Sequence, residues 1–313
     1  MQSPAEFMAY FSYSAGWRTV RFMPEKVAYA TFSQMADQVW RQHGKGVRQL
    51  ERNLARVTPE ASQAQLRVMS REAMQKYFQY WCDAFRLPDW SYRRTVDTFV
   101  LENKSTLQAA LDQGKGVIAS MPHAGNWDHG GAYMALAMDS LVSVAEDLKP
   151  ERLTKKFLDY RRELGIEVLV LRKGEDVFGQ LVDRLAKGKL LALLGDRDLT
   201  SRGVPVDFFG EATRFPAGPA VLAHSTGAPL FAAHLWCEGK MSFCRVGDGI
   251  HTDRSLDRDT YVRLATQQIA DEMAEGLREH PTDWHMMQPL WLADLDQSRL
   301  RASDYDHPAS GPT

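Results

Sequence analysis

The chain is poor in cysteine and lacks the short signatures of several enzyme classes. Its three cysteines, Cys82, Cys237 and Cys244, show no paired C-x-x-C spacing. This argues against a disulfide framework and against a cysteine-ligated zinc site, and it fits a reducing cytoplasm. No G-x-x-x-x-G-K-[ST], G-x-G-x-x-G or G-x-S-x-G element occurs, so no P-loop, dinucleotide fold or serine nucleophile elbow is indicated.

The sequence also lacks a strong charge excess and a long apolar run. Its 38 Lys and Arg residues nearly balance its 40 Asp and Glu residues, which argues against a general nucleic-acid binder. No apolar run approaches the length that spans a bilayer, and the start, residues 1–6, lacks the basic and apolar regions of a secretory signal. We therefore expect a protein that is cytoplasmic or bound to a membrane surface from that side.

The 313 residues, of which 44% are hydrophobic, can bury a large core. Residues 1–88 carry helical patterns without convincing strands, and residues 89–297 alternate strands with helices. This alternation predicts an α/β catalytic domain with a central, mostly parallel sheet flanked by helices. The tail, residues 298–313, is predicted to be flexible.

The expected elements follow from hydrophobic periodicity and from glycines at helix ends. Strands are predicted at Val117–Met121, Leu141–Ala145, Glu167–Leu171, Leu190–Leu194, Leu230–Trp236 and Ser242–Val246. Helices are predicted at 27–40, 46–57, 64–85, 106–113, 127–138, 151–164, 175–187, 219–226 and 258–279.

The first helical segment, Phe7 to Trp17, mixes aromatic side chains with the cations that follow it. Such a segment suits a membrane interface, where aromatic anchors and cations meet the lipid headgroups. The same pattern also fits an amphipathic helix that packs on the main domain. The sequence leaves both interpretations open.

The most informative stretch, residues 120–131, places His123 five positions before Asp128 between a predicted strand and a predicted helix. His123 would then lie at the carboxyl end of the strand, where α/β sheets bind ligands. The Asp128 carboxylate, in the first helical turn, is predicted to reach back and orient the imidazole for general base catalysis. The alternative is a capped turn in which Asn126 or Asp128 satisfies backbone donors.

Two further clusters are predicted at or near the same edge of the sheet. Asp196, Arg197 and Asp198 follow directly after a predicted strand, although an isolated charged loop with internal ion pairs is the simpler alternative. Further along, Phe208 and Phe209 precede a Thr–Arg step, so they are candidates for an acyl slot or for ordinary core. Arg214 beside the next helix start would suit an anion.

A cationic helix, residues 151–162, follows Glu146 and is a candidate phosphate-binding element. Within it, Arg161 is favoured over Lys155 and Lys156, which are typical of a solvated face. A metal site built from histidine and aspartate near residue 123 is conceivable by residue type. It has no recognised ligand spacing, so no metal is predicted.

In order along most of the chain, these clusters resemble the bacterial lysophospholipid-acyltransferase superfamily, in the branch of lipid A late acyltransferases and phosphatidylinositol mannoside acyltransferases. The segments that carry the resemblance are residues 123–128, 145–150, 196–199, 208–214 and 281–289. Residues 15–18, 23–25 and 52–57 are similar to the phosphatidylinositol mannoside group. That group carries glutamate where this chain has Asp196, so the acid is kept but shortened.

The resemblance implies transfer of a long acyl chain, typically palmitoyl, from acyl-CoA to a mannose hydroxyl of a phosphatidylinositol mannoside. No bound cofactor is implied, because acyl-CoA is a substrate. The partners would be acyl-CoA, the glycolipid and the cytoplasmic face of the inner membrane, where the protein would be peripheral; no nucleic acid is expected.

The resemblance also implies roles for individual residues. His123 would be the general base, Asp128 would orient it, and Asp196 would support catalysis; donors near Gly125 or the helix start would meet the oxyanion. The predicted substrate-binding residues are Asn126, Trp127, Glu146, Arg161, Arg197, Arg202, Arg214 and His224. Of these, Arg202 and His224 do not match the residues typical of the family at those places.

Three alternatives remain at the level of the sequence. The same His–Asp pair would serve an acyltransferase for another glycolipid or a lysophospholipid. It would also serve a thioesterase or esterase in which water replaces the sugar hydroxyl. The third alternative is a lipid-binding or assembly protein without catalysis.

Overall fold

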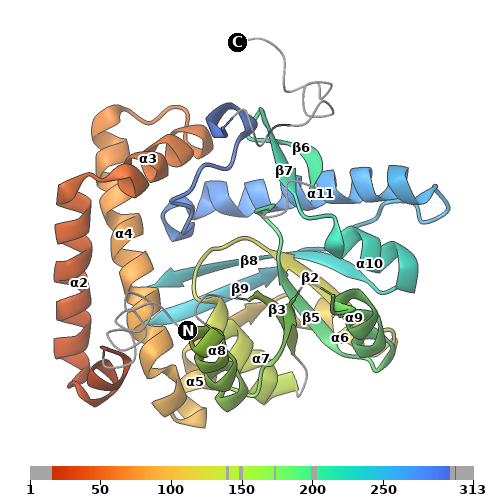
Figure 1. Cartoon of the computed structure of the whole chain (residues 1–313), viewed down its shortest axis with the longest axis horizontal. Coiled ribbons are helices and arrows are strands. Elements are labelled where there is room, and N and C mark those ends of the chain that lie inside the picture. The colour runs from red at the N-terminus through yellow and green to blue at the C-terminus, as the bar shows by residue number, and fades with distance from the viewer. Residues whose placement is uncertain are drawn as a thin grey trace.

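A seven-stranded sheet forms the centre of the protein (Figure 1). The computed structural model describes residues 16–138, 141–147, 151–172, 174–198, 203–296 and 300. The strands are β1 (Phe99–Glu102), β2 (Val117–Met121), β3 (Val142–Glu146), β4 (Glu167–Leu171), β5 (Leu190–Leu194), β8 (Leu230–Glu238) and β9 (Met241–Val246). Their order is β1-β9-β8-β2-β5-β3-β4, and every neighbouring pair is parallel except β8 with β9. The predicted α/β class with a mostly parallel sheet is confirmed.

Helices cover both faces of this sheet. One face packs against α9 (Val177–Ala186), α10 (Gly218–Thr226) and α11 (Arg258–Glu279), whose buried side chains share a core cluster with β5. The other face packs against α6 (Lys104–Leu111), α7 (Trp127–Met138) and α8 (Glu151–Glu163). Because both faces are covered, the inner strands β2 and β5 are almost continuously apolar, as in other parallel sheets.

The N-terminal helices form a separate layer at one end of the sheet (Figure 1). They are α2 (Glu25–Gln42), α3 (Lys45–Val57) and α4 (Gln63–Arg86), and residues 16–22 are also helical. At the start of α4, Ser62 and Gln65 form a reciprocal capping box. Short helices follow at η1 (Leu87–Asp89) and α5 (Tyr92–Asp97). The helical character predicted for this region is confirmed, whereas Phe7 to Ala15 lie outside the described residues.

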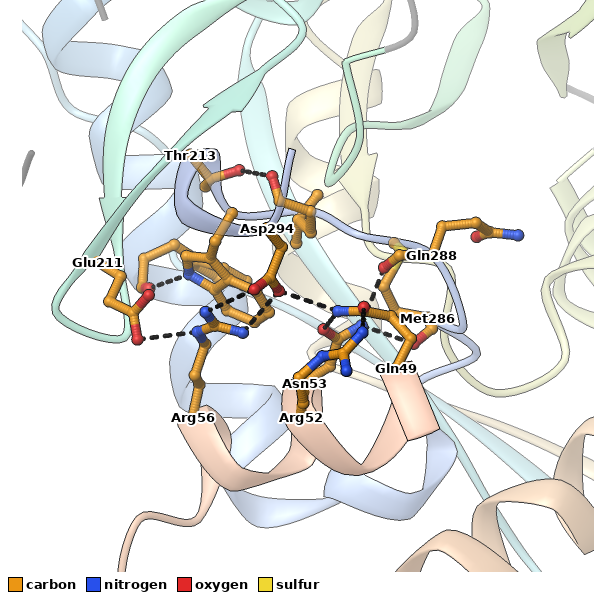
Figure 2. Close-up of polar contacts among 12 residues, drawn as sticks. Gln49, Arg52, Asn53, Arg56, Glu211, Thr213, Met286, Gln288 and Asp294 are labelled. Atoms are coloured by element: carbon orange, nitrogen blue, oxygen red, sulfur yellow. Dashed lines mark hydrogen bonds and ion pairs between the residues drawn. The ribbon is translucent and has the colours of Figure 1, made fainter. Parts of the chain in front are cut away.

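A polar face of α3 joins this layer to the C-terminal part of the chain (Figure 2). Asn53, which is fully buried, donates to the Met286 and Gln288 carbonyls at 2.8 and 3.1 Å. Arg56 pairs with Glu211 and with Asp294, both at 2.8 Å. Buried polar groups are costly unless they are paired, so these contacts fix how α3 sits against the C-terminal segment.

The register of the central strands determines which residues meet at the carboxyl edge. Strands β2 and β5 pair in parallel from Val117 with Leu190 to Met121 with Leu194, so both end at the same level. Gly195 continues the pairing by donating its N–H to the Met121 carbonyl at 2.9 Å. The chain segments that follow the two strands therefore emerge side by side.

The short helix α5, the three short η helices, the edge strand β1 and the β6–β7 hairpin were not predicted. The four-residue edge strand β1 is too short to show a period in the sequence. The hairpin of β6 (Val204–Phe208) and β7 (Glu211–Phe215) stands where the sequence indicates only a turn leading into a helix. Its turn uses Phe209 and Gly210, both with positive φ, so the signal was present in the Gly turn.

The remaining described elements are the short helices η2 (Pro281–Asp283) and η3 (Leu292–Asp294). None of the helices in the described ranges combines the length and apolar character needed to cross a bilayer.

Candidate active site

His123 and Asp196 form a hydrogen-bonded pair at the carboxyl edge of the sheet. His123 follows β2 by two residues and Asp196 follows β5 by two residues, so the strand register brings them together. Nδ1 of His123 lies 2.5 Å from Asp196 Oδ1, and the His123 backbone N–H donates to Oδ2 at 2.9 Å. Asp196 is fully buried, whereas the His123 side chain is 29% exposed. The outer face of the imidazole is thus accessible while its inner nitrogen is held.

The electrostatics of this pair favour an imidazolium beside a carboxylate. Burial alone would lower the pKa of His123, but the charge and hydrogen bond of Asp196 outweigh it, so the pKa is raised. Burial would raise the pKa of Asp196, yet His123 and the indole N–H of Trp284 hold that pKa below its usual value. Asp196 therefore stays ionised and increases the basicity of His123.

Asp128 does not orient His123 in the way that the sequence indicates. Its two carboxylate oxygens accept from the Tyr80 hydroxyl at 2.9 Å and from Arg161 Nε at 3.1 Å. Among the described residues no hydrogen bond joins Asp128 to His123. Asp128 lies in the first turn of α7, where its side chain faces α4 and α8, and the carboxylate beside the imidazole comes from another strand.

The turn between β2 and α7 is held by its own backbone and by Asn126. Gly125 has φ +61°, and a Cβ there would lie 2.7 Å from the Leu235 carbonyl carbon, so only glycine fits. Asn126 is buried and caps α7 by accepting from the His129 N–H at 3.0 Å. The capping alternative therefore holds for Asn126, while its predicted substrate contact stays a prediction. The Gly125 N–H is also taken, by the Asp283 carbonyl at 3.0 Å, so it is not free for an oxyanion.

An apolar cavity opens beside this turn. It lies between the sheet and α7, on the face that α6 and α8 also cover. Most of its lining is apolar, and its polar side chains include Asp128 and Arg161. Trp127 also lines it, and its ring centroid lies 5.8 Å from that of His123. Its indole Nε1 is buried without a hydrogen-bond partner among the described residues.

Two glycines of α7 make room for this cavity. A Cβ on Gly131 would lie 2.6 Å from Ile166 Cδ1, and a Cβ on Gly130 would lie 3.1 Å from Leu235 Cδ2. Both glycines line the cavity together with those neighbours. The small residues therefore let α7 approach the sheet while an apolar space remains between them.

Other predicted site residues lie around the same edge. Glu146 ends β3, is exposed, and acts electrostatically on His123. Arg197 and Arg214 line a second cavity next to Asp196, where Arg214 lies 3.7 Å from Asp198. Arg202 lies outside the described residues.

His224 does not join the site, contrary to the sequence prediction. It lies near the end of α10, which leads into the first residues of β8, and Leu230 of β8 pairs with Ile118 near the start of β2. That level of the sheet is opposite to the edge where His123 lies. Its Nε2 faces the Leu256 carbonyl at 3.3 Å, and its ring packs against Tyr261.

The aromatic pair of the hairpin divides between core and surface. Phe208 is fully buried and packs against Phe215 and Trp291. Phe209 is partly buried and lies under the Arg278 guanidinium. Phe208 is therefore ordinary core, and neither ring lines the apolar cavity beside α7.

A C-terminal segment, residues 281–288, crosses the site and is called the strap here. The His285 N–H donates to the His123 carbonyl at 2.8 Å, and Trp284 Nε1 donates to Asp196 Oδ2 at 2.9 Å. Burial lowers the pKa of His285 to about 4, so its ring is neutral, and its Nε2–H donates to the Gly125 carbonyl. The family resemblance includes this segment, but no role was predicted for it.

Metal-ligand geometry is not found in the parts of the chain that the structure describes, where no three His, Cys, Asp or Glu side chains gather to hold an ion. His129, a histidine of α7, is fully buried between the Ser242 hydroxyl and the Thr95 carbonyl.

Comparison with known proteins places this chain in a family. Residues 1–293 match the family model described as bacterial lipid A biosynthesis acyltransferase. A phosphatidylinositol mannoside acyltransferase of Mycolicibacterium smegmatis is 43% identical over 289 residues, which cover 92% of each chain. A protein of the same name from Mycobacterium tuberculosis is 41% identical over 293 residues, or 92% of this chain and 90% of that one. The chain therefore belongs to the bacterial lipid A biosynthesis acyltransferase family and is an acyltransferase.

Proposed function

We propose that this enzyme transfers a long-chain acyl group from acyl-CoA to a mannose hydroxyl of a phosphatidylinositol mannoside. The acyl group that we propose is palmitoyl. The observation that carries the proposal is the His123–Asp196 pair, whose accessible imidazole lies beside the apolar cavity under α7. Relatives named for this activity share 41–43% of their residues with the chain. That similarity supports the choice of glycolipid over other acceptors.

In the proposed reaction His123 is the general base. Nδ1–H is directed to Asp196, so Nε2 takes the proton of the attacking sugar hydroxyl as its oxygen bonds to the thioester carbonyl carbon. The tetrahedral intermediate then collapses, the carbon–sulfur bond breaks, and the imidazolium returns the proton to the departing CoA thiolate. The products are the ester and free CoA, and no acyl-enzyme forms.

The oxyanion of the intermediate needs donors near the start of α7. The N–H groups of Trp127 and Asp128 belong to the first turn of this helix and have no intrahelical acceptor. The positive end of the helix dipole adds to their effect. We assign the oxyanion to this helix start, because the Gly125 N–H is already bonded to Asp283.

The acyl chain is assigned to the apolar cavity, whose lining suits a hydrocarbon tail. Trp127 and Arg161 line the cavity, and Asp128 holds Arg161 in place there. A guanidinium in that position suits a phosphate of CoA. Asp128 is then a residue that organises the donor side, while Asp196 organises the base.

The polar acceptor is assigned to the other side of Asp196. Arg197 is half-buried there, and Arg214 lines the same second cavity. Exposed Glu146 lies at the same edge of the sheet and suits hydrogen bonding to sugar hydroxyls. An anionic phosphoinositol with mannose attached matches this mixture of cations and acceptors.

The enzyme is proposed to act as a peripheral protein that meets its glycolipid on the cytoplasmic face of the inner membrane. Phe22 is 83% exposed, and α2 presents Val27, Met35 and Val39 to solvent. On a helix, these three α2 positions fall on one side. Exposed apolar residues grouped in this way are typical of a surface that contacts lipid.

The test is release of CoA from palmitoyl-CoA by the purified enzyme. We expect thiol release that depends on added phosphatidylinositol mannoside and yields the acylated glycolipid by mass spectrometry. His123→Ala should lower turnover about 10²- to 10⁴-fold, the usual contribution of a general base. His251→Ala, an exposed histidine of a loop, is the matched control and should keep turnover within about twofold of wild type.

Thiol release that is independent of any glycolipid would identify a thioesterase instead. Equal turnover with a lysophospholipid acceptor would identify a different acyltransferase. Full activity of His123→Ala would exclude the proposed base.

A further inference from the structure

We propose that Trp284 is a positioning residue for the Asp196–His123 pair, and that its indole N–H fixes the carboxylate that orients the general base. This inference rests on the proposed function, because it concerns the same imidazole. It assigns a role to a residue of the strap, which is separate from β2 and β5, the two strands that precede His123 and Asp196.

The geometry around Asp196 makes the indole the second donor on one oxygen. Oδ2 accepts from the His123 backbone N–H and from Trp284 Nε1, both at 2.9 Å, and Oδ1 faces His123 Nδ1. Asp196 is fully buried, so it has no contact with bulk water. With three contacts on its two oxygens, the carboxylate has one orientation, and that orientation sets the plane of the imidazole.

Trp284 is itself fixed by the backbone around it. It is fully buried and forms a β-bridge with Ala124, in the same turn as His123. On either side of it, the Asp283 carbonyl accepts from Gly125 and the His285 N–H donates to the His123 carbonyl. The strap therefore holds both the turn that carries the base and the acid that orients it.

The strap is in turn anchored to the N-terminal layer (Figure 2). Asn53 donates to the Met286 and Gln288 carbonyls, just after Trp284. Gln49, from the same helix, bonds Asn53 and Asp294 at 2.8 and 2.9 Å. Because these contacts are largely buried, the indole cannot shift without breaking them, which makes Trp284 a rigid donor.

Loss of the indole N–H has a definite electrostatic consequence. That N–H stabilises the negative charge of Asp196, so without it the carboxylate attracts the proton of the pair more strongly. The pKa of the neighbouring imidazole then rises. Since His123 acts as a base only when its Nε2 is unprotonated, the acidic limb of the pH–rate profile should move to higher pH.

The experiment compares Trp284→Phe with Trp291→Phe in pH–rate profiles of kcat and kcat/KM. Trp291 is a matched control, because it is also fully buried and its Nε1 donates at 2.9 Å to a backbone carbonyl, that of Phe208. We expect Trp284→Phe to lower kcat about ten- to a hundredfold, the usual effect of losing a hydrogen bond to a charged group. The acidic limb of the Trp284→Phe profile should move up by about half a pH unit or more, while that of Trp291→Phe stays in place.

A second variant separates the N–H from the packing. Benzothienylalanine at position 284, introduced by amber suppression, keeps the bicyclic shape and removes the donor, so it should reproduce the shift even if Trp284→Phe folds poorly. A variant at 284 that is folded and has the wild-type acidic limb overturns this proposal. His123→Ala, measured in parallel, distinguishes failure of this proposal from failure of the proposed function, because full activity of His123→Ala would overturn the proposed function itself.

Discussion

At the scale of single residues, the two aspartates near His123 have different partners and therefore different expected roles. Asp196 bonds the imidazole directly, whereas Asp128 bonds Tyr80 and Arg161. Spacing along the chain predicted that Asp128 orients His123, because the two are only five residues apart. The nearer residue in sequence is held by α4 and α8, and the residue 73 positions away is the one in contact.

Substitution of each aspartate by asparagine separates these roles. Asp196→Asn should lower kcat about 10²- to 10⁴-fold, because an amide facing Nδ1 no longer stabilises the imidazolium. Asp128→Asn should raise the KM for acyl-CoA and leave the acidic limb of the pH profile in place, because it loosens Arg161 rather than His123. Steady-state kinetics with palmitoyl-CoA measure both effects, and the opposite pattern would restore Asp128 as the orienting acid.

The raised pKa of His123 fixes the direction of the pH dependence. A base must be unprotonated to act, so activity should fall as the pH drops through a value above about 6.5, the ordinary pKa of an imidazole. In Asp196→Asn the negative charge that raises the pKa of His123 is absent, so the residual activity should persist to lower pH. Profiles of kcat/KM for the two proteins between about pH 5 and 9 check this sign.

At the scale of the elements, the packing of α7 against the sheet determines the shape of the apolar cavity. Gly131 lies one helical turn beyond Trp127, so a side chain there narrows the cavity away from its mouth. A Cβ on Gly131 would lie 2.6 Å from Ile166 Cδ1, and both residues line the cavity, so the added methyl group changes the shape of that space. Chain-length preference should therefore depend on this position.

Gly131→Ala should favour shorter acyl chains. We expect kcat/KM for palmitoyl-CoA to fall about tenfold relative to lauroyl-CoA, the lower end of what one methyl group changes in an apolar pocket. Gly218→Ala is the matched control, because a Cβ added there would meet no neighbouring atom within 4 Å and its φ is not positive. An unchanged ratio in Gly131→Ala would show that the acyl chain does not pass this helix.

At the scale of the whole molecule, the N-terminal layer has two sides with different expected partners. Its inner side anchors the strap through α3 (Figure 2), and its outer side exposes Phe22 and the apolar positions of α2. If the outer side contacts lipid, the site and the membrane are joined through one rigid helical layer.

The double variant Phe22→Ser, Met35→Ser should bind vesicles that contain phosphatidylinositol about tenfold more weakly, because two exposed apolar side chains no longer enter the interface. Leu264→Ser on α11, which is 39% exposed, is the control and should bind like wild type. Co-sedimentation with such vesicles measures the difference. Equal loss in the control would point to a general hydrophobic effect, and no loss in the double variant would place the membrane contact elsewhere.

The sequence by itself determined the α/β class, most helices and strands, and the two segments that meet at the site. It could do so because periodicity and glycine punctuation are local, and because Met121 and Leu194 each end an apolar strand. The resemblance to a family added the role of general base that we propose for His123. The strand β1 was missed because its four residues are too few to show a period. The β6–β7 hairpin was missed because its Gly turn was interpreted as a turn leading into a helix.

Only the tertiary structure decided which carboxylate holds His123, that His224 lies away from the site, and that Trp284 bonds Asp196. These contacts join residues that are far apart in the chain, and strand register and packing, rather than spacing, place them. The cavity under α7 is also a tertiary property, since it depends on how closely two glycines let a helix approach a sheet. Local pattern thus determines the elements, and the distances between them determine the chemistry.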